Sequence, residues 1–313
     1  MMITAHSLTK RYGATTAVDD LTFEVLPGVV TGFLGPNGSG KSTTMRMIMG
    51  LDVPDSGSAL IDGKPYCDMA WPLREVGGLL DAKAFHPARN ARNHLRWLAL
   101  SNDIPMRRVD EVLDQVGLSS VVNRRAGKFS LGMSQRLGIA ATLLGDPGVL
   151  LFDEPVNGLD PEGIRWVRHF LRGLAAEGRS VLVSSHLISE MSLTADRLVV
   201  IGRGRLIAET SVADFVNRNG PRAVRLVTPD PTEFTAVLIA TGANVGVVEG
   251  GSLTVEGATA TQIGDLAARH GLRIYELVPI TASLEDAFME LTQDEVEFRP
   301  STMSGAIPAG GGE

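Results

Sequence analysis

The chain has 313 residues, of which 44% are hydrophobic and 21% are charged, and its formal net charge is −7. This composition excludes wholesale disorder, collagen-like sequence and coiled coil, and the length predicts about two domains. The apolar stretches have the length of strands and are far shorter than the ~18 residues that a membrane span needs.

The net negative charge lies in residues 216–313, which contain 6 basic and 13 acidic residues. No concentrated basic surface is therefore expected, and nucleic acid is a poor partner for this chain. The N-terminus has no apolar segment typical of a signal peptide, and Cys67 has no second cysteine to pair with. These features predict a cytoplasmic protein.

Strand and helix patterns alternate over the first two hundred residues. Buried strands are predicted at 29–34, 149–153 and 180–184. The first strand runs into a glycine-rich segment and a helix that opens at about Ser42. Residues 88–145 have mostly helical periodicity, which predicts a helical subdomain inserted at about 85–145. The alternation predicts an α/β fold in which ligands bind at the carboxyl ends of the strands.

The pattern changes near residues 210–222, where a short helix is predicted to end at Asn219-Gly220-Pro221. A second domain is predicted at 219–292. Its elements are a strand at 222–228, a helix at 232–241, strands at 244–249 and 252–256, a helix at 260–270 and a strand at 272–278. This βαββαβ order is typical of a small α+β domain of the ferredoxin-like kind.

Three shorter predictions concern the same third of the chain. Residues 249–252 are predicted to turn between the two middle strands, and residues 283–291 form an amphipathic segment. The tail, residues 293–313, has too few apolar groups to pack, so we expect it to be disordered.

The glycine-rich segment has the spacing GxxxxGK[ST] between a predicted strand and a predicted helix. In such a loop, backbone N–H groups converge on phosphate oxygens and the helix N-terminus adds a positive dipole end. Lys41 is predicted to reach the β- and γ-phosphates, and Ser42 to ligate Mg²⁺. The predicted nucleotide-binding residues of the loop are Gly35, Pro36, Asn37, Gly38, Ser39, Gly40, Lys41, Ser42 and Thr43.

Two adjacent carboxylates, Asp153 and Glu154, end the apolar strand at 149–153. At the phosphate edge of a sheet, the first carboxylate can hold Mg²⁺ and the second can polarise a water molecule. We therefore predict that Asp153 is a metal ligand, together with Ser42, and that Glu154 is a general base.

Two further segments make a family resemblance specific: FSLGMSQRL at 129–137 and DEPVNGLDP at 153–161. Residues 1–218 resemble the ATP-binding subunit of a bacterial ABC transporter, of the drug-export type that includes multidrug and antibiotic efflux pumps. The resemblance implies a P-loop NTPase core, ATP and Mg²⁺ as ligands, and ATP hydrolysis coupled to transport. It also implies an accessory or regulatory role for the domain at 219–292.

The resemblance assigns roles to residues outside the phosphate loop. The signature, which binds the nucleotide of the opposite protomer, corresponds to Ser130, Leu131, Gly132 and Met133, and a helical run is predicted after it from about Ser134. Asp160 belongs to the D-loop, and Tyr12 matches the aromatic residue that stacks on adenine. The implied catalytic residues are Glu154, His186 and Lys41, with His186 as the switch histidine.

The implied assembly is a head-to-tail homodimer in which each ATP lies between the Walker motifs of one protomer and the signature of the other. The chain has no predicted membrane span, so a separate transmembrane permease would bind the small-molecule transport substrate. The protein would then be peripheral, at the cytoplasmic face of the membrane.

Two positions depart from the family pattern. Asp81 stands where the family usually has the glutamine of the Q-loop, and an acid there would repel phosphate but could approach Mg²⁺ or a water molecule. Leu131 stands where the signature usually has a glycine, so its side chain could hinder close approach of the backbone to the nucleotide.

Two alternatives to a transport motor stay open from the sequence. One is a soluble ABC ATPase without a permease, although such proteins often have two ATP cassettes in one chain. The other is a nucleotide-binding regulator with weak hydrolysis, for which Asp81 and Leu131 are the motivation and the retained Lys41, Asp153 and Glu154 are the counterargument.

Overall fold

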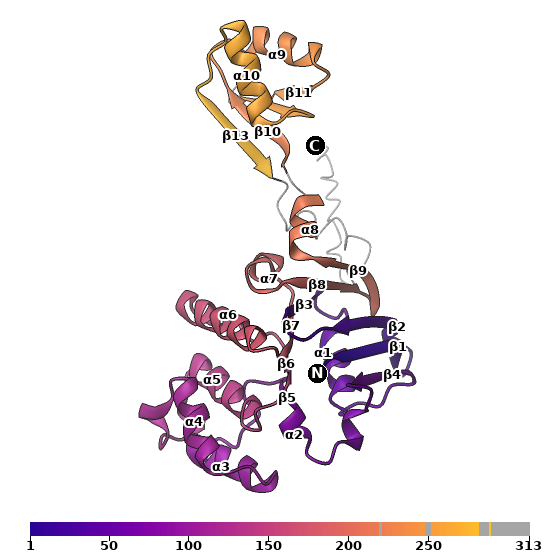
Figure 1. Ribbon diagram of the computed structural model, residues 1–313, viewed down its shortest axis with the longest axis vertical. Helices are drawn as coiled ribbons and strands as arrows, with labels where there is room; N and C mark the ends of the chain where they lie inside the picture. Colours follow the sequence, from indigo (N-terminus) through magenta and orange to yellow (C-terminus); the bar gives the residue numbers. More distant parts are fainter. Residues whose placement is uncertain (219–220, 248–251, 282–287, 289–313) are drawn as a thin grey trace, which may run out of the picture.

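Three β-sheets organise the chain, which the computed structural model describes at residues 1–218, 221–247, 252–281 and 288 (Figure 1). A six-stranded sheet and a three-stranded sheet belong to the first two hundred residues. A four-stranded sheet belongs to the C-terminal part and lies beyond helix α8, Val212–Arg218.

The six-stranded sheet has the order β5-β6-β7-β3-β8-β9. Its strands are β3 Val30–Leu34, β5 Val76–Leu79, β6 Val149–Phe152, β7 Ser180–Ser185, β8 Arg197–Gly202 and β9 Arg205–Ser211. All neighbours are parallel except β8 and β9. Every residue of β3, β6 and β7 is buried, because both faces of the parallel sheet are covered. The three strands predicted from the sequence are thus confirmed.

Alternate residues of each central strand enter two different hydrophobic clusters. Leu150 and Phe152 pack with the helices α6, Pro161–Ala176, and α7, Ile188–Thr194. Val149 and Leu151 pack on the opposite face with α1, Lys41–Ile48, and with the three-stranded sheet. This period of two fixes the register of the strands and therefore the residues at their carboxyl ends.

The three-stranded antiparallel sheet was not predicted from the sequence. Its order is β2-β1-β4, formed by β1 Ile3–Tyr12, β2 Thr15–Val25 and β4 Ser56–Ile61. One face of β1 and β2 packs on the core, with Ile3, Ala5 and Phe23 buried. The sheet brings Tyr12 to the end of β1, where the side chain is half exposed.

The helical subdomain contains α3 Ala91–Ser101, α4 Arg107–Gln115 and α5 Leu131–Thr142, after the short helix α2 Pro72–Glu75. We expected a helical run from about Ser134, and this was wrong by one turn: α5 begins at Leu131 because Ser130 caps it. Leu131, Gly132 and Met133 therefore form its first turn. Among the described residues, no helix is long and apolar enough to cross a membrane.

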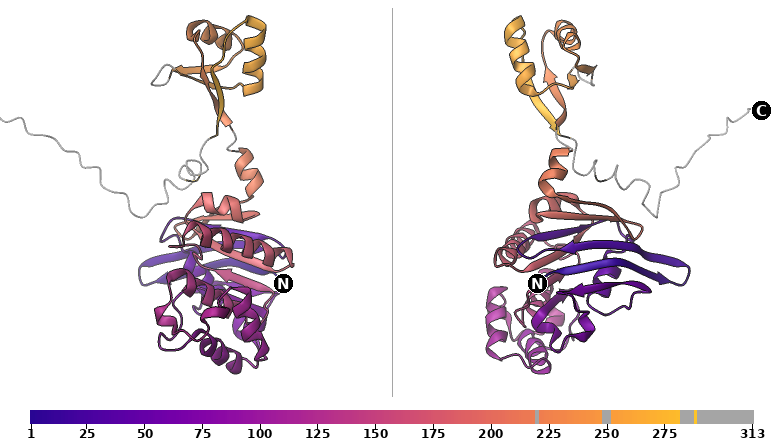
Figure 2. Two further views of the ribbon diagram at one scale, coloured as in Figure 1. Left: turned by 90° about the vertical axis from the view of Figure 1, so that its left-hand side faces the viewer. Right: turned by 45° about the vertical axis from the view of Figure 1, so that its right-hand side comes forward.

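The C-terminal sheet has the order β11-β12-β10-β13, with all neighbours antiparallel. Its elements are β10 Pro221–Val227, α9 Pro231–Ala240, β11 Asn244–Val247, β12 Leu253–Glu256, α10 Ala260–His270 and β13 Glu276–Thr281. This is the βαββαβ element order expected from the sequence, with α9 and α10 on one face of the sheet (Figure 2).

The last strand of this sheet corrects one prediction. We expected it at 272–278, but β13 spans Glu276–Thr281, because Leu272 and Ile274 pack against the cluster before the pairing with β10 begins. The predicted turn at 249–252 falls mostly outside the described residues. The segment at 283–291 and the tail at 293–313 also lie outside them, apart from Phe288, which is buried in the cluster that contains α6 and α7.

Candidate nucleotide-binding site

The glycine-rich loop joins the buried strand β3 to α1, as its sequence predicts. Gly38 and Gly40 have positive φ angles of 83° and 102°, and a methyl group added at Gly40 would lie 2.5 Å from the carbonyl oxygen of Ala17. The loop can therefore take this shape only with glycine at position 40. It encloses a cavity of about 210 Å³ lined by Ala17, Asn37, Gly38, Gly40, Lys41, Ser42, Thr43 and Glu154.

Lys41 lies in this cavity with its side chain 6% exposed. Its ammonium group donates hydrogen bonds to the carbonyl oxygens of Gly35, at 2.6 Å, and Pro36, at 3.0 Å. Burial lowers the pKa of Lys41, while the nearby carboxylates of Glu154 and Asp153 act in the opposite direction. The Lys41 ammonium group is thus held beside the backbone of the loop, where an anionic phosphate would contact it.

Asp153 follows the last residue of β6 and is held by two hydroxyl groups. Ser42 Oγ donates to Asp153 Oδ2 at 2.6 Å, and Ser184 Oγ, from the neighbouring strand β7, donates to Asp153 Oδ1. A hydroxyl and a carboxylate side by side are oxygen donors of the kind that Mg²⁺ prefers. The residue types and their contact therefore fit a small divalent cation.

Glu154 lies between Lys41 and His186. Its backbone has a φ angle of 47°, in the left-handed region, and its N–H group donates to Ser184 Oγ at 2.9 Å. Both carboxylate oxygens lie within 3.1 Å of His186 Nδ1, and Oε1 lies 3.8 Å from Lys41 Nζ. Because β6 and β7 are parallel neighbours, Glu154 and His186 meet at the same edge of the sheet.

Tyr12 is the last residue of β1, and a hydrogen bond from its hydroxyl group fixes the far end of its ring. Its hydroxyl group donates to Asp52 Oδ2 at 2.8 Å, and Arg46 of α1 binds both oxygens of Asp52, at 2.7 and 3.1 Å. Partial burial and the hydrogen bond to Asp52 raise the pKa of Tyr12. Lys10 Nζ lies 5.5 Å from the ring centroid. The half-exposed ring is thus a fixed stacking surface tied to the helix that carries Lys41.

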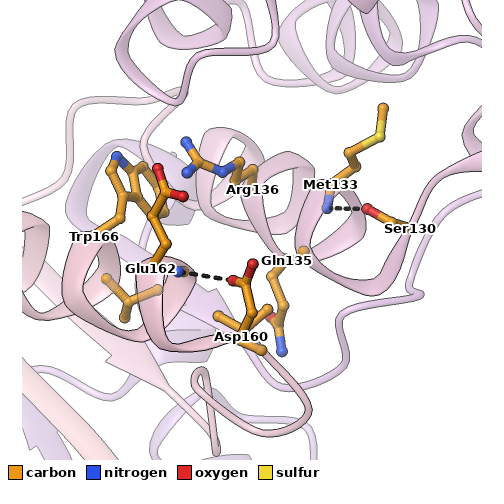
Figure 3. A pocket seen from close by; sticks show the side chains of 11 residues that line it. Ser130, Met133, Gln135, Arg136, Asp160, Glu162 and Trp166 are labelled. Carbon is orange, nitrogen blue, oxygen red and sulfur yellow. Dashed lines mark hydrogen bonds between the residues drawn. The ribbon is translucent and has the colours of Figure 1, made fainter.

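Four further predicted residues, Ser130, Gly132, Met133 and Asp160, line a second cavity, of about 280 Å³, between the N-termini of α5 and α6 (Figure 3). Ser130 Oγ accepts a hydrogen bond from Met133 N at 3.2 Å and caps α5. Asp160 Oδ1 accepts one from Gly163 N at 2.9 Å and caps α6. Figure 3 shows both capping bonds. Gly132 and Met133 also line this cavity, and it shares no lining residue with the phosphate-loop cavity.

Comparison with known proteins agrees with this geometry. A protein-family model described as ABC transporter matches residues 18–157. The uncharacterized ABC transporter ATP-binding protein YhcH of Bacillus subtilis (strain 168) is 36% identical over 295 residues, which cover 93% of this chain and 96% of the relative. The chain belongs to the family of ABC transporter ATP-binding proteins.

Two further likenesses cover most of the chain. The bacitracin transport ATP-binding protein BcrA of Bacillus licheniformis is 40% identical over 70% of this chain and 72% of its own length. The structure of cbiO1 from Clostridium perfringens, part of an ABC transporter complex, is 28% identical, with a TM-score of 0.61 over 68% of this chain and 89% of its own. A model of a domain of unknown function (DUF8746) matches residues 222–285.

Family membership gives the activity of the chain as a whole. This ABC protein is an ATP-binding and ATP-hydrolysing subunit of a transporter. The phosphate-loop cavity lies at the carboxyl edge of the parallel sheet, where the sequence predicts that ligands bind.

Asp81 does not line the phosphate-loop cavity. It follows β5 and lines a groove of about 330 Å³ between the core and the helical subdomain, and its Oδ1 accepts a hydrogen bond from Lys83 N at 2.8 Å. Apolar residues of the groove include Leu51, Tyr66, Phe85, Trp97 and Leu98. In this structure Asp81 therefore belongs to the groove, and its assignment to the Q-loop position stays a prediction.

Three residues of the site were missed by sequence reasoning. Ser184 joins Asp153 to the backbone of Glu154, while Asp52 and Arg46 hold Tyr12. A polar residue at the end of an apolar strand is a signal that could have found Ser184. Asp52 and Arg46 have no such signal, because they reach Tyr12 only through the unpredicted three-stranded sheet.

Proposed function

We propose that two copies of this ABC protein close head to tail around two ATP molecules and drive a separate permease that exports a small amphiphilic compound. The observation that carries this proposal is the separation of the two cavities. The phosphate loop with Glu154 and the signature with Asp160 line different cavities of one chain, with no residue in common. A second copy can supply the missing half of each site, as an isologous dimer does twice.

The residues of the phosphate-loop half divide the chemistry among them. Ser42 and Asp153 hold Mg²⁺, which when bound offsets negative charge on the phosphates. Lys41 binds the β- and γ-phosphates, and Tyr12 stacks on adenine. The contact between Ser42 and Asp153 and the fixed ring of Tyr12 support these roles.

Glu154 accepts the proton of the water molecule that attacks the γ-phosphorus, while the bond from that phosphorus to the bridging oxygen of ADP breaks. His186 orients the Glu154 carboxylate and donates a hydrogen bond to the γ-phosphate. Support comes from the contacts of His186 Nδ1 with both Glu154 oxygens. The signature residues Ser130, Leu131, Gly132 and Met133 contact the γ-phosphate region from the opposite protomer, through the capped N-terminus of α5.

A complementation experiment tests the shared site. Lys41→Ala disables the phosphate loop and Ser130→Arg disables the signature, so each homodimer should be inactive. In an equal mixture, half of the dimers contain one chain of each kind and one intact site, which predicts up to about a quarter of wild-type turnover. Turnover no higher than that of the separate variants would contradict the shared site. A mixture of Lys41→Ala with Glu154→Gln, both in the same half, is the matched control and should stay inactive.

The groove beside Asp81 is our candidate for the permease contact. Leu51 and Trp97 are 55% and 51% exposed there, and the groove lies between the core and the helical subdomain, the two parts that carry the two halves of the site. An amphipathic cytoplasmic helix of the permease can bury its apolar face in such a groove. Closure of the dimer would then move the helix, and the protein would be peripheral at the cytoplasmic face of the membrane.

Co-purification tests this contact. Trp97→Asp should abolish recovery of the permease when the two are expressed together, because it places a charge in an apolar interface. Leu100→Asp is the matched control, since Leu100 is 70% exposed on the same helix but does not line the groove. Equal recovery with both variants would contradict the proposed contact.

Export of drug-like compounds rests on the relatives. The relative from Bacillus licheniformis is described as a bacitracin transport protein, and the lantibiotic transport ATP-binding protein SrtF of Streptococcus pyogenes is 34% identical over 66% of this chain. Cells that lack the gene should become more sensitive to the exported compound, and Glu154→Gln should not restore resistance. Unchanged sensitivity to a panel of peptide antibiotics and lipophilic drugs would contradict this substrate class.

The C-terminal domain is our candidate for an accessory or regulatory role. Its own hydrophobic cluster, with Phe234, Leu253 and Val255 buried, is separate from the clusters of the core. Removal of residues 222–313 is expected to lower dimer formation or transport rather than ATP binding. Wild-type dimerisation and transport by the truncated chain would contradict this role.

A further inference from the structure

Two leucine–glycine pairs join the first turn of α5 to the loop before α6. A methyl group added at Gly158 would lie 2.5 Å from Leu131 Cδ2, so the leucine fills the space beside this glycine. In the reverse direction, a methyl group added at Gly132 would lie 3.6 Å from Leu159 Cδ2. Each segment thus presents a leucine to a glycine of the other.

The first pair is specific to one side chain. Apart from the two chain neighbours of Gly158, the atoms of the described residues within 4 Å of the added methyl group are Cδ2 and Cγ of Leu131. Leu131 is 38% exposed, so its side chain lies over the D-loop and not in the core. The bulky residue at the signature position that the family usually fills with glycine therefore has a partner within its own chain.

Both segments are anchored to rigid elements. Ser130 fixes the start of α5 and Asp160 fixes the start of α6. The chain between Glu154 and Gly158 is short and held by turns, in which Asn157 N donates to Glu154 O and Leu159 N donates to Val156 O, both at 3.2 Å. A displacement of the signature therefore reaches the segment next to Glu154 through the contact between Leu131 and Gly158.

We propose that Leu131 is a positioning residue that couples the signature to the D-loop and to Glu154 of the same chain. The inference rests on the proposed dimer, in which the signature contacts the partner's nucleotide while Glu154 acts on the chain's own. Leu131 thereby links the two ATP sites within each protomer. The two leucine–glycine pairs, Leu131 with Gly158 and Leu159 with Gly132, make the connection between the two segments rigid, because closely packed groups transmit a displacement to one another.

Four variants test the coupling: Gly158→Ala, Leu131→Ala, the double variant, and Gly178→Ala as a control. Gly178 has a φ angle of 90°, and apart from its chain neighbours no atom of a described residue lies within 4 Å of an added methyl group, so it reports the backbone strain of alanine without a clash. Gly158→Ala should lower turnover at saturating ATP at least about tenfold, the size expected of overpacking, and well beyond the effect of the control.

The decisive comparison is between Gly158→Ala and the double variant. Alanine at 158 strains the backbone equally in both, so the difference isolates the contact with Leu131. We expect the double variant to be several-fold faster. Leu131→Ala alone should lower turnover while the melting temperature changes little, and Leu131→Met should restore it.

A double variant no faster than Gly158→Ala, or a Leu131→Ala protein with wild-type turnover, would overturn the inference. Failure of the proposed dimer is a separate result, seen as wild-type protein that neither hydrolyses ATP nor dimerises. Urea unfolding of the same four variants then still tests the contact, because a coupled pair gives non-additive changes in the free energy of unfolding.

Discussion

The two halves of the proposed ATP site are built in different ways. In the phosphate-loop half, side chains from the start of α1 and from the ends of parallel strands hold one another, as Lys41, Glu154 and His186 do. In the signature half, Ser130 and Asp160 use their side-chain oxygens to cap their own helices. The first half can therefore bind and activate a nucleotide, while the second offers a preorganised helix N-terminus to a ligand that another chain holds.

The largest expected effect comes from Glu154→Gln, which keeps the shape of the phosphate-loop half and removes its base. Turnover should fall by about 10²- to 10⁴-fold, as for loss of a general base, while ATP still binds. The variant should accumulate as a dimer with ATP and Mg²⁺, measured by sedimentation, and EDTA should reverse this. If the variant stays monomeric under these conditions, the signature half does not bind the nucleotide of a second chain, and the proposed division of the site into two halves is wrong.

A smaller effect is expected of Ser184→Ala, which tests whether the phosphate-loop half depends on its internal hydrogen bonds. Ser184 bonds to Asp153 and to the backbone of Glu154, so its loss should lower turnover about tenfold, given ~1.5 kcal/mol for a hydrogen bond to a charged group. Ser185→Ala is the control, since Ser185 is equally buried, but within the described part of the chain its hydroxyl group bonds to Leu187 and to neither carboxylate residue. Equal turnover of both variants would show that Asp153 needs no support from β7.

Tyr12→Phe should have a modest effect on ATP binding alone. The ring remains but loses its hydrogen bond to Asp52, so we expect a KM for ATP about three times higher at unchanged kcat, a loss of less than ~1 kcal/mol. Tyr12→Ala removes the stacking surface and should raise KM about tenfold or more. Tyr275→Phe, at an exposed tyrosine of the C-terminal domain, is the control. A change in kcat would contradict the prediction, because it would show that Tyr12 affects hydrolysis as well as adenine binding.

The smallest effect concerns the stability of the subdomain that carries the signature half. His94 of α3 is buried, and burial and Arg89 lower its pKa from the usual 6.5. The unfolded chain therefore binds a proton below pH 6.5 that the folded chain does not, and stability falls as the pH drops. His94→Gln should remove up to about 1 kcal/mol of the difference in unfolding free energy between pH 7.5 and 5.5. His270→Gln, at an exposed histidine, is the control, and equal pH profiles for both variants would contradict the prediction.

Local sequence was sufficient for the phosphate loop, the carboxylates and the C-terminal element order. GxxxxGK[ST] needs only glycines at fixed spacing, and Asp153 with Glu154 needs only a buried strand before it. The start of α5 was misplaced because glycine and serine in FSLGMS suggest a loop, whereas Ser130 is a cap. The three-stranded sheet was missed because β1 and β4 pair across about fifty residues, with bulges that interrupt their alternation.

The sequence by itself determined the nucleotide chemistry, because backbone conformation and strand ends are set by neighbouring residues. Only the tertiary structure decided which distant groups complete that chemistry. Ser184 reaches Asp153, Asp52 and Arg46 reach Tyr12, and Leu131 reaches Gly158, each through side chains far apart in sequence. The physical reason is that such contacts depend on sheet order and helix packing, which no local pattern encodes.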